Sequence, residues 1–315
     1  MISVNKEKNF ASAVVYIHNN QKQIKLFMDT ILDVFNANFL KYEVIFVNDC
    51  SNDSTIEQIE KYTDGTRNAV VSILNMSYYQ GLELSMNAGV DLAIGDFVFE
   101  FDNINVDYNA DMIMKVYYEA IKGFDIVSAS SNGKKRTTSS LFYKIFNKYS
   151  NIQYALETET FRVLSRRAIN RVHSISKTIP YRKAVYANCG LELKNIKYEA
   201  TINDNKFENS KLRSKSNRNL ATSAIVLYTD IAYKFTSIMT MVMMLITIIV
   251  GIYTTTIFIT GNPIAGWTTL MLFLAFGFFG LFTILSMVLK YLVVILDLSF
   301  KKQKYVFESI KKITK

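Results

Sequence analysis

The sequence has few of the residues that build cross-linked, fibrous or zinc-bound proteins. Among its 315 residues are two cysteines, two prolines, two histidines and twelve glycines. This composition excludes a disulfide-stabilised scaffold and a collagen-like fibre. Cys50 and Cys189 match no zinc-binding spacing, and His18 and His173 are the only imidazoles, so we expect no zinc site. The cysteines are interpreted as free thiols in a reducing compartment.

Charged residues are missing from one long segment. None occurs between Phe235 and Leu289, and a polar turn at 260–266 (TGNPIAG) divides this stretch. Each half is long enough to cross a hydrocarbon core of roughly 30 Å. We therefore predict two transmembrane helices, at about 235–259 and 267–289, with Trp267 near the interface; a buried helical pair in a soluble protein is the alternative.

Basic residues flank this apolar stretch on both sides. The net charge is +9, and much of the excess lies in the tail at 290–315 and in the segment 206–234. This distribution favours a membrane surface over nucleic acid. The hairpin turn has no basic residue, so both termini are predicted to be cytoplasmic. We also expect no secretory signal peptide, because the N-terminus has no apolar run before a cleavage site.

The first 200 residues alternate between apolar runs and helical periodicity. Strands are predicted at 12–17, 42–47, 69–74, 96–101 and 125–129, and helices at 21–36, 55–62, 80–93 and 110–121. Repeated β-α units predict an α/β fold with a mainly parallel sheet and helices on both faces. Ligands of such sheets bind beyond the carboxyl ends of the strands.

Acidic residues follow two of the predicted strands. Asp49, Ser51 and Asp53 come after the second strand, where they could bind a base or ribose, or could simply cap the next helix. Asp102 ends the fourth strand, where it could hold a divalent cation on phosphate oxygens or lie in a solvated turn.

Two groups of basic residues could bind phosphate. Arg162, Arg166 and Arg167 lie in the run FRVLSRR, which suits a diphosphate or merely begins a helix. A second group could bind a lipid phosphate or serve as an ordinary cytoplasmic flank; it comprises Lys206, Lys211, Arg213, Lys215 and Arg218.

Taken together, these segments resemble the family 2 glycosyltransferases that act on polyprenyl phosphate, such as dolichol-phosphate mannose synthase and the bacterial undecaprenyl-phosphate glucosyltransferases. The similar segments occur in the family's order: SAVVYIHNN, YEVIFVNDCSNDST, GLELSMNAGVDLAIGDFVFEFDN, TETFRVLSRRAI, FENSKLRSK and QKYVFESIKK. They extend over nearly the whole chain.

The resemblance implies a nucleotide-diphospho-sugar transferase (GT-A) domain at 1–205, followed by interfacial helices at 206–234. It implies transfer of one sugar from a nucleotide-diphospho-sugar to polyprenyl phosphate, with Mg²⁺ or Mn²⁺ as cofactor. The implied catalytic residues are Asp102 and Arg162. The implied nucleotide-sugar site comprises Asn19, Asp49, Ser51, Asp53, Gly81 and Asp102. The implied lipid-phosphate site comprises Arg162, Arg166, Lys211 and Arg213.

The chain departs from the family's pattern at several acidic positions. Asn48 and Thr160 stand where the family has acids, and Ile104 and Val106 replace two expected oxygen ligands of the metal motif. Isoleucine and valine cannot bind a hard cation. Asp102 would hold the metal with Asn103, Asn105 or Asp107, or the metal is bound more weakly.

Three hypotheses follow. The first is an active transferase at the bacterial plasma membrane, suggested by the Asn-, Lys- and Ile-rich composition, working on cell-surface glycans and forming homo-oligomers as relatives do. The second is a catalytically degenerate partner or scaffold with the same fold. The third is a polymerising synthase, which would need a Q-x-x-R-W motif; the only tryptophan is Trp267.

Overall fold

The computed structural model describes residues 6–63, 69–133, 137–150, 152–175, 181–201, 219–225 and 307–313, with scattered positions between 229 and 295. The chain divides into two compact units. The first comprises residues 1–147, 152–221 and 302–315, and the second comprises 148–151 and 222–301. All elements that form the candidate site belong to the first unit.

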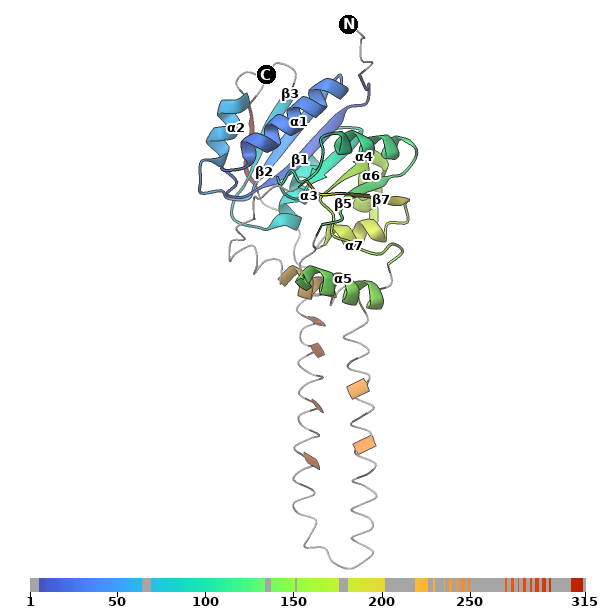
Figure 1. Cartoon of the computed structure of the whole chain (residues 1–315). Coiled ribbons are helices and arrows are strands. Elements are labelled where there is room, and N and C mark those ends of the chain that lie inside the picture. The colour runs from blue at the N-terminus through green and yellow to red at the C-terminus, as the bar shows by residue number, and fades with distance from the viewer. Residues whose placement is uncertain are drawn as a thin grey trace, which may run out of the picture. The chain divides into compact units, whose positions relative to one another are not determined.

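The first unit is built on one mixed sheet with the strand order β7-β5-β6-β4-β1-β2-β3-β8 (Figure 1). The strands are β1 (Ala11–Ile17), β2 (Tyr42–Asn48), β3 (Ala69–Met76), β4 (Phe97–Phe101), β5 (Ile126–Ser131), β6 (Phe161–Ser165), β7 (Leu193–Tyr198) and β8 (Phe307–Lys312). The pairs among β1 to β4 are parallel, whereas β6 and β8 run antiparallel to their neighbours. The predicted GT-A-type α/β fold with a mainly parallel sheet is confirmed.

Helices cover both faces of the sheet. They are α1 (Ile24–Asn38), α2 (Thr55–Thr63), α3 (Leu82–Leu92), α4 (Asp111–Ile121), α5 (Thr137–Tyr149), α6 (Arg166–Ile175) and α7 (Arg182–Ala187). Helices α1, α2 and α4 share one hydrophobic core with alternate residues of the strands. Helix α3 packs on the opposite face, where Gly89 lies against Val14 and Val47. Every residue of β1 and β2 is buried, as expected for parallel strands covered on both faces.

Aromatic rings fill the core beneath α1 and α4. Phe35 contacts Phe99 at a centroid distance of 4.8 Å, and Phe39 contacts Tyr117 at 4.9 Å, both with edge-to-face geometry. Such contacts favour one arrangement of the helices over the sheet because the positive ring edge meets a negative ring face. The four predicted helices and five predicted strands in this part of the chain are all present.

Three strands, β6, β7 and β8, were not expected from periodicity. The run FRVLSRR, interpreted as a motif or as a helix start, forms strand β6, and helix α6 begins only at Arg166. The predicted basic tail at 290–315 contributes strand β8, which pairs with the edge strand β3. Lys311 reinforces this pairing through an ion pair of 2.7 Å to Glu60 of α2. A segment beyond the uncharged stretch therefore completes the sheet of the first unit.

The predicted transmembrane helices at 235–259 and 267–289 lie outside the described residues apart from scattered helical positions. The basic segment with Lys211 and Arg213 lies outside them entirely. No helix among the described residues is both long and apolar enough to cross a bilayer.

Gly89→Ala tests the close approach of α3 to the sheet. An added Cβ would lie 2.6 Å from Val47 Cγ2, so helix and sheet must separate. We expect the free energy of unfolding to fall by about 1–3 kcal/mol, measured by urea denaturation of the full chain followed by circular dichroism. Gly133→Ala is the control, because its nearest neighbour would be Ser131 Oγ at 3.1 Å. Equal urea midpoints for Gly89→Ala and Gly133→Ala would contradict the close packing of α3 on the sheet.

Candidate functional site

The candidate site lies beyond the carboxyl ends of β4, β1 and β2. The chain proceeds from β1 to β2 and β3 on one side and then returns to place β4 on the other side of β1. The point where the strand order reverses lies between β1 and β4, and ligands of open α/β sheets bind there. Polar residues follow all three strands: His18–Asn20 after β1, Asn48–Asp53 around the end of β2, and Asp102 after β4.

The Asp49 carboxylate connects two turns through hydrogen bonds. Its side chain is fully buried, and its oxygens accept hydrogen bonds from the backbone of Gln80 (2.7 Å) and Gly81 (2.8 Å) and from the hydroxyl of Tyr16 (2.9 Å). Both oxygens are therefore occupied within the protein. In this structure the carboxylate fixes the start of α3 against the end of β2, and its contact with a base stays a prediction.

The turns after β1 and β2 are joined by reciprocal hydrogen bonds. Asn19 donates its backbone N–H to Ser51 Oγ (3.1 Å), and Asn52 donates its own to Asn19 Oδ1 (2.7 Å). Asp53 accepts from the backbone N–H groups of Thr55 (3.1 Å) and Gln21 (3.0 Å), so it caps α2 as the simpler sequence interpretation stated. Asn19, Ser51 and Asp53 thus lie in neighbouring, hydrogen-bonded turns, and their binding of a nucleotide-sugar stays a prediction.

An aromatic pair that the sequence analysis did not identify lies beside these turns. The ring of His18 contacts the ring of Tyr79 with centroids 4.9 Å apart, and His18 Nδ1 lies 2.6 Å from the carbonyl oxygen of Asp49. Both side chains are half-buried, so part of each ring remains accessible. An exposed ring surface beside a strand end is suited to stacking against a nucleobase.

A buried cluster of ion pairs lies below Asp102. In the antiparallel register of β4 and β6, Arg162 is directly opposite Glu100, and Asp102 follows two residues after Glu100, just past the end of β4. Arg162 donates to Glu100 (2.8 Å), Asp102 (2.7 Å) and Glu159 (3.1 Å). Strand register therefore brings the two predicted catalytic residues, Asp102 and Arg162, into direct contact.

Arg182, at the start of α7, is a second cation of this cluster that the sequence analysis missed. It lies 2.6 Å from Asp102, 3.0 Å from Glu83 of α3 and 2.9 Å from Glu100. Tyr186 of the same helix donates to Glu100 at 2.8 Å. The acid within the apolar strand FVFEF was the available signal, because a buried carboxylate requires a cationic partner.

The pair of Asp102 and Arg162 remains charged at neutral pH. Burial alone would raise the pKa of Asp102, but the charges of Arg162, Arg182 and Lys183 outweigh burial and hold that pKa well below its ordinary value. Burial would likewise lower the pKa of Arg162, whereas Asp102, Glu159 and Glu100 raise it above that of a free guanidinium. Arg162 and Arg182 are at most 1% exposed and Asp102 is 7% exposed. The ion pairs are therefore a fixed part of the fold.

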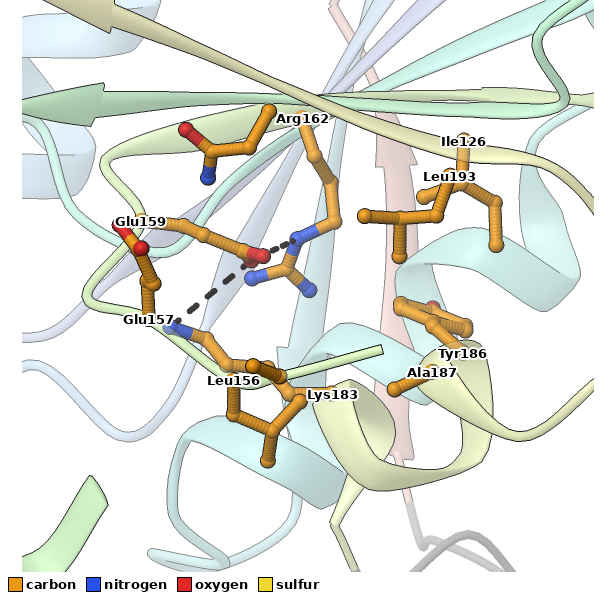
Figure 2. A pocket seen from close by; sticks show the side chains of 11 residues that line it. Ile126, Leu156, Glu157, Glu159, Arg162, Lys183, Tyr186, Ala187 and Leu193 are labelled. Atoms are coloured by element: carbon orange, nitrogen blue, oxygen red, sulfur yellow. Dashed lines mark hydrogen bonds and ion pairs between the residues drawn. The ribbon is translucent and has the colours of Figure 1, made fainter. Parts of the chain in front are cut away.

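A small cavity adjoins the cluster. Figure 2 shows Glu159 lying between Arg162 and Lys183. Its Oε2 atom is 3.1 Å from Arg162 Nε and 3.9 Å from Lys183 Nζ. The cavity volume of about 60 Å³ holds a few water molecules, whereas ligand pockets measure roughly 300–1,000 Å³. It is therefore too small for a nucleotide-sugar.

The residues expected to bind a divalent cation are engaged elsewhere. Both oxygens of Asp102 are paired with guanidinium groups. Asn103 Oδ1 accepts from the backbone of Asn105 (2.9 Å), and Asp107 accepts from Tyr198 (2.7 Å). Ile104 is 2% exposed in the hydrophobic core. In the described part of the chain no group of three or more His, Cys, Asp or Glu side chains could hold a metal ion, and the residues around Asp102 do not fit one.

Arg166 does not join Arg162, contrary to the predicted lipid-phosphate site. Strand β6 runs antiparallel to β4, so Phe161 is opposite Phe101 and Ser165 is opposite Phe97. Arg166 therefore lies at the opposite edge of the sheet from Asp102. There its guanidinium donates to the carbonyl oxygens of Gly95 (3.0 Å) and Ala93 (2.9 Å), just after α3.

The chain is similar in sequence to several proteins named as glycosyltransferases. It is 26% identical over 277 residues to the prophage bactoprenol glucosyl transferase homolog of Escherichia coli, covering 84% of this chain and 87% of that relative. It is 26% identical to an uncharacterized glycosyltransferase of Synechocystis sp. and spans 57% of that relative's length and of its own. Among solved structures, a mannosyltransferase from Pyrobaculum calidifontis in complex with GDP-Man and Mn²⁺ is 13% identical, with 70% of this chain and 63% of that chain covered and a TM-score of 0.48.

The sequence model of the family described as Glycosyl transferase family 2 matches residues 12–186. This match spans β1 to α7 and includes Asp49, Asp102, Arg162 and Arg182. More than half of the chain is covered, and the predicted family is confirmed: the chain belongs to glycosyl transferase family 2.

Proposed function

We propose that this glycosyltransferase moves one sugar from a nucleotide-diphospho-sugar to a polyprenyl phosphate at a membrane. One observation carries the proposal: the likeness to proteins named bactoprenol glucosyl transferase covers 84% of the chain. A continuous match of that extent in a 315-residue chain necessarily enters the uncharged stretch that begins at Phe235. The likeness therefore includes both the catalytic domain and part of the uncharged stretch.

The proposed donor site is the carboxyl edge around Asp102. The nucleoside lies over the joined turns after β1 and β2, with a base against the His18–Tyr79 pair, and the sugar lies towards Asp102. Asp49 and Arg162 support this surface from below through the contacts described above. Their role is to hold the site in one geometry, which is what transfer between two bound substrates requires.

In the proposed reaction an oxygen of the lipid phosphate attacks the anomeric carbon of the sugar. A bond forms from that oxygen to the carbon, and the bond from the carbon to the diphosphate oxygen breaks. The nucleoside diphosphate leaves with the electron pair. A phosphate monoester is largely dianionic at neutral pH, with a second pKa of about 6. The nucleophile is therefore already ionised, and Thr160 in place of a carboxylate removes no required base.

The proposed membrane arrangement follows from β8. This strand pairs with β3, so the chain on either side of the uncharged stretch belongs to one sheet. A segment that leaves and re-enters the same domain crosses a bilayer an even number of times. Two spans at 235–259 and 267–289 meet this condition, and the basic flanks favour the cytoplasmic side. The homo-oligomeric state stays a prediction.

A catalytically inactive partner is the second candidate function. It is favoured by one observation: both oxygens of Asp102 are paired with arginines, and Ile104 is buried where the family has an oxygen ligand. Such a protein would retain the fold and the membrane segment without transferring sugar.

A transfer assay separates the two candidates. We expect the purified chain to transfer labelled sugar from one member of a panel of UDP- and GDP-sugars to undecaprenyl phosphate. Asp102→Asn should lower the rate by at least about 100-fold, because the site loses a fixed charge beside the reacting sugar. Asp111→Asn, at an exposed acid that begins α4, should stay within twofold. Absence of transfer by folded wild-type protein from every donor would support the inactive partner.

Cysteine labelling tests the membrane arrangement. With Cys50 and Cys189 replaced by serine, Asn262→Cys should react with a membrane-impermeant maleimide in intact cells. Thr314→Cys should react only after permeabilisation, because its position adjoins β8 on the catalytic side. Labelling of both sites in intact cells, or of neither, would contradict a hairpin with a cytoplasmic catalytic domain.

A further inference from the structure

The segment at the position of the family's metal motif is engaged by the protein's own side chains. Ile104 is buried in the core and Asp102 lies between two arginines. Arg162 binds one oxygen of the Asp102 carboxylate at 2.7 Å, and Arg182 binds the other at 2.6 Å. The carboxylate that would bind a divalent cation thus already has one cationic partner on each oxygen.

These arginines are fixed by other partners. Arg162 is also bound to Glu100 and Glu159, and the ring of Tyr186 lies 5.6 Å from its guanidinium carbon. Arg182 is bound to Glu83 through both its backbone N–H and its side chain. Moving either side chain away from Asp102 would leave Glu100, which is completely buried, without full charge compensation.

A divalent cation could therefore bind Asp102 only by displacing Arg162 or Arg182 from its oxygens. Displacing either arginine would also separate it from its buried glutamate partners and leave charges unpaired inside the protein. The neighbouring oxygens cannot compensate, since Asn103 and Asp107 are used in the turn and by Tyr198. The site is built around protein cations and has no vacant set of oxygen ligands.

We infer that Asp102 in this chain binds no divalent cation, and that Arg162 and Arg182 take the place of a metal ion as the partners of its two carboxylate oxygens. Nucleotide-diphospho-sugar binding is then independent of Mg²⁺ and Mn²⁺. The inference rests on the proposed function, since it concerns the charge balance of the donor site. Arg182 is on this view a positioning residue that holds Asp102, and it distinguishes this chain from a metal-dependent transferase.

The first test measures Mn²⁺ directly on the full chain in detergent, by electron paramagnetic resonance with and without UDP or GDP. We expect no stoichiometric Mn²⁺ beyond that bound by free nucleotide. Calorimetry of UDP and GDP should give dissociation constants that agree within about threefold between EDTA and 1 mM Mn²⁺. One tightly bound Mn²⁺ per chain, or a tenfold loss of nucleotide affinity in EDTA, would overturn the inference.

The second test asks whether the arginines are the reason. The double variant Arg182→Met with Glu83→Gln removes one positive and one negative charge and frees one oxygen of Asp102. We expect Mn²⁺ affinity to rise at least tenfold above wild type, and Asp102→Asn in the same background to abolish the gain. Lys122→Met, which removes an exposed cation paired with Glu119, should leave Mn²⁺ affinity unchanged. An equal gain in Lys122→Met would mean that Mn²⁺ binding does not depend on freeing an oxygen of Asp102 and would overturn the inference.

The outcomes separate this inference from the proposed function. If neither UDP nor GDP binds under any condition, the proposed function fails, while the Mn²⁺ titration of the wild-type chain still decides the inference. If the double variant does not fold, that same wild-type titration and the comparison in EDTA remain decisive, because neither uses a substitution.

Discussion

The buried ion pairs among Arg162, Arg182, Glu100 and Asp102 are the interaction on which the rest of the structure depends. They connect β4, β6 and α7 and reach α3 through Glu83, so elements far apart in the chain share one charge balance. Removing charges from water costs several kcal/mol per ion, and this cost is offset only when every charge has close partners. The cluster meets that condition. Loss of one member would leave the other charges buried without a partner. The geometry at the carboxyl end of β4 therefore depends on residues from several elements of the domain.

The same principle explains how the acids predicted to contact substrate are used. Asp49 and Asp53 lie at the site, yet their oxygens are occupied by backbone N–H groups of neighbouring turns. Turns beyond parallel strands have many unpaired N–H groups, and a carboxylate satisfies several of them at once. The surface left for a ligand is formed by what these acids hold in place, including the half-buried rings of His18 and Tyr79.

The sequence was sufficient for elements whose pattern is local. Strands such as β1 and β2 are short apolar runs, and helices such as α1 have a clear apolar stripe, so periodicity found them. Strand β6 was missed because it carries Arg162, whose burial depends on Glu100 in another strand. Strand β8 was missed because its exposed, lysine-rich sequence resembles a tail and its pairing partner lies more than 200 residues earlier. Arg182 was missed for a related reason: Glu83, Glu100 and Asp102 approach it only through tertiary packing, and no spacing in the chain records that proximity.

A protein cation and a bound metal ion meet the same electrostatic need under different constraints. A metal ion can arrive with the nucleotide and leave with it, so its site must keep oxygen ligands unpaired and accessible. A guanidinium is permanently charged, needs no vacant ligands and also stabilises the fold, but it must be neutralised when the site is empty. Glu83, Glu100 and Glu159 provide that neutralisation here. A site that uses arginines as its cations needs glutamates to neutralise them, and it needs no oxygen ligand at position 104. The isoleucine at this position and the three supporting glutamates therefore have the same physical cause.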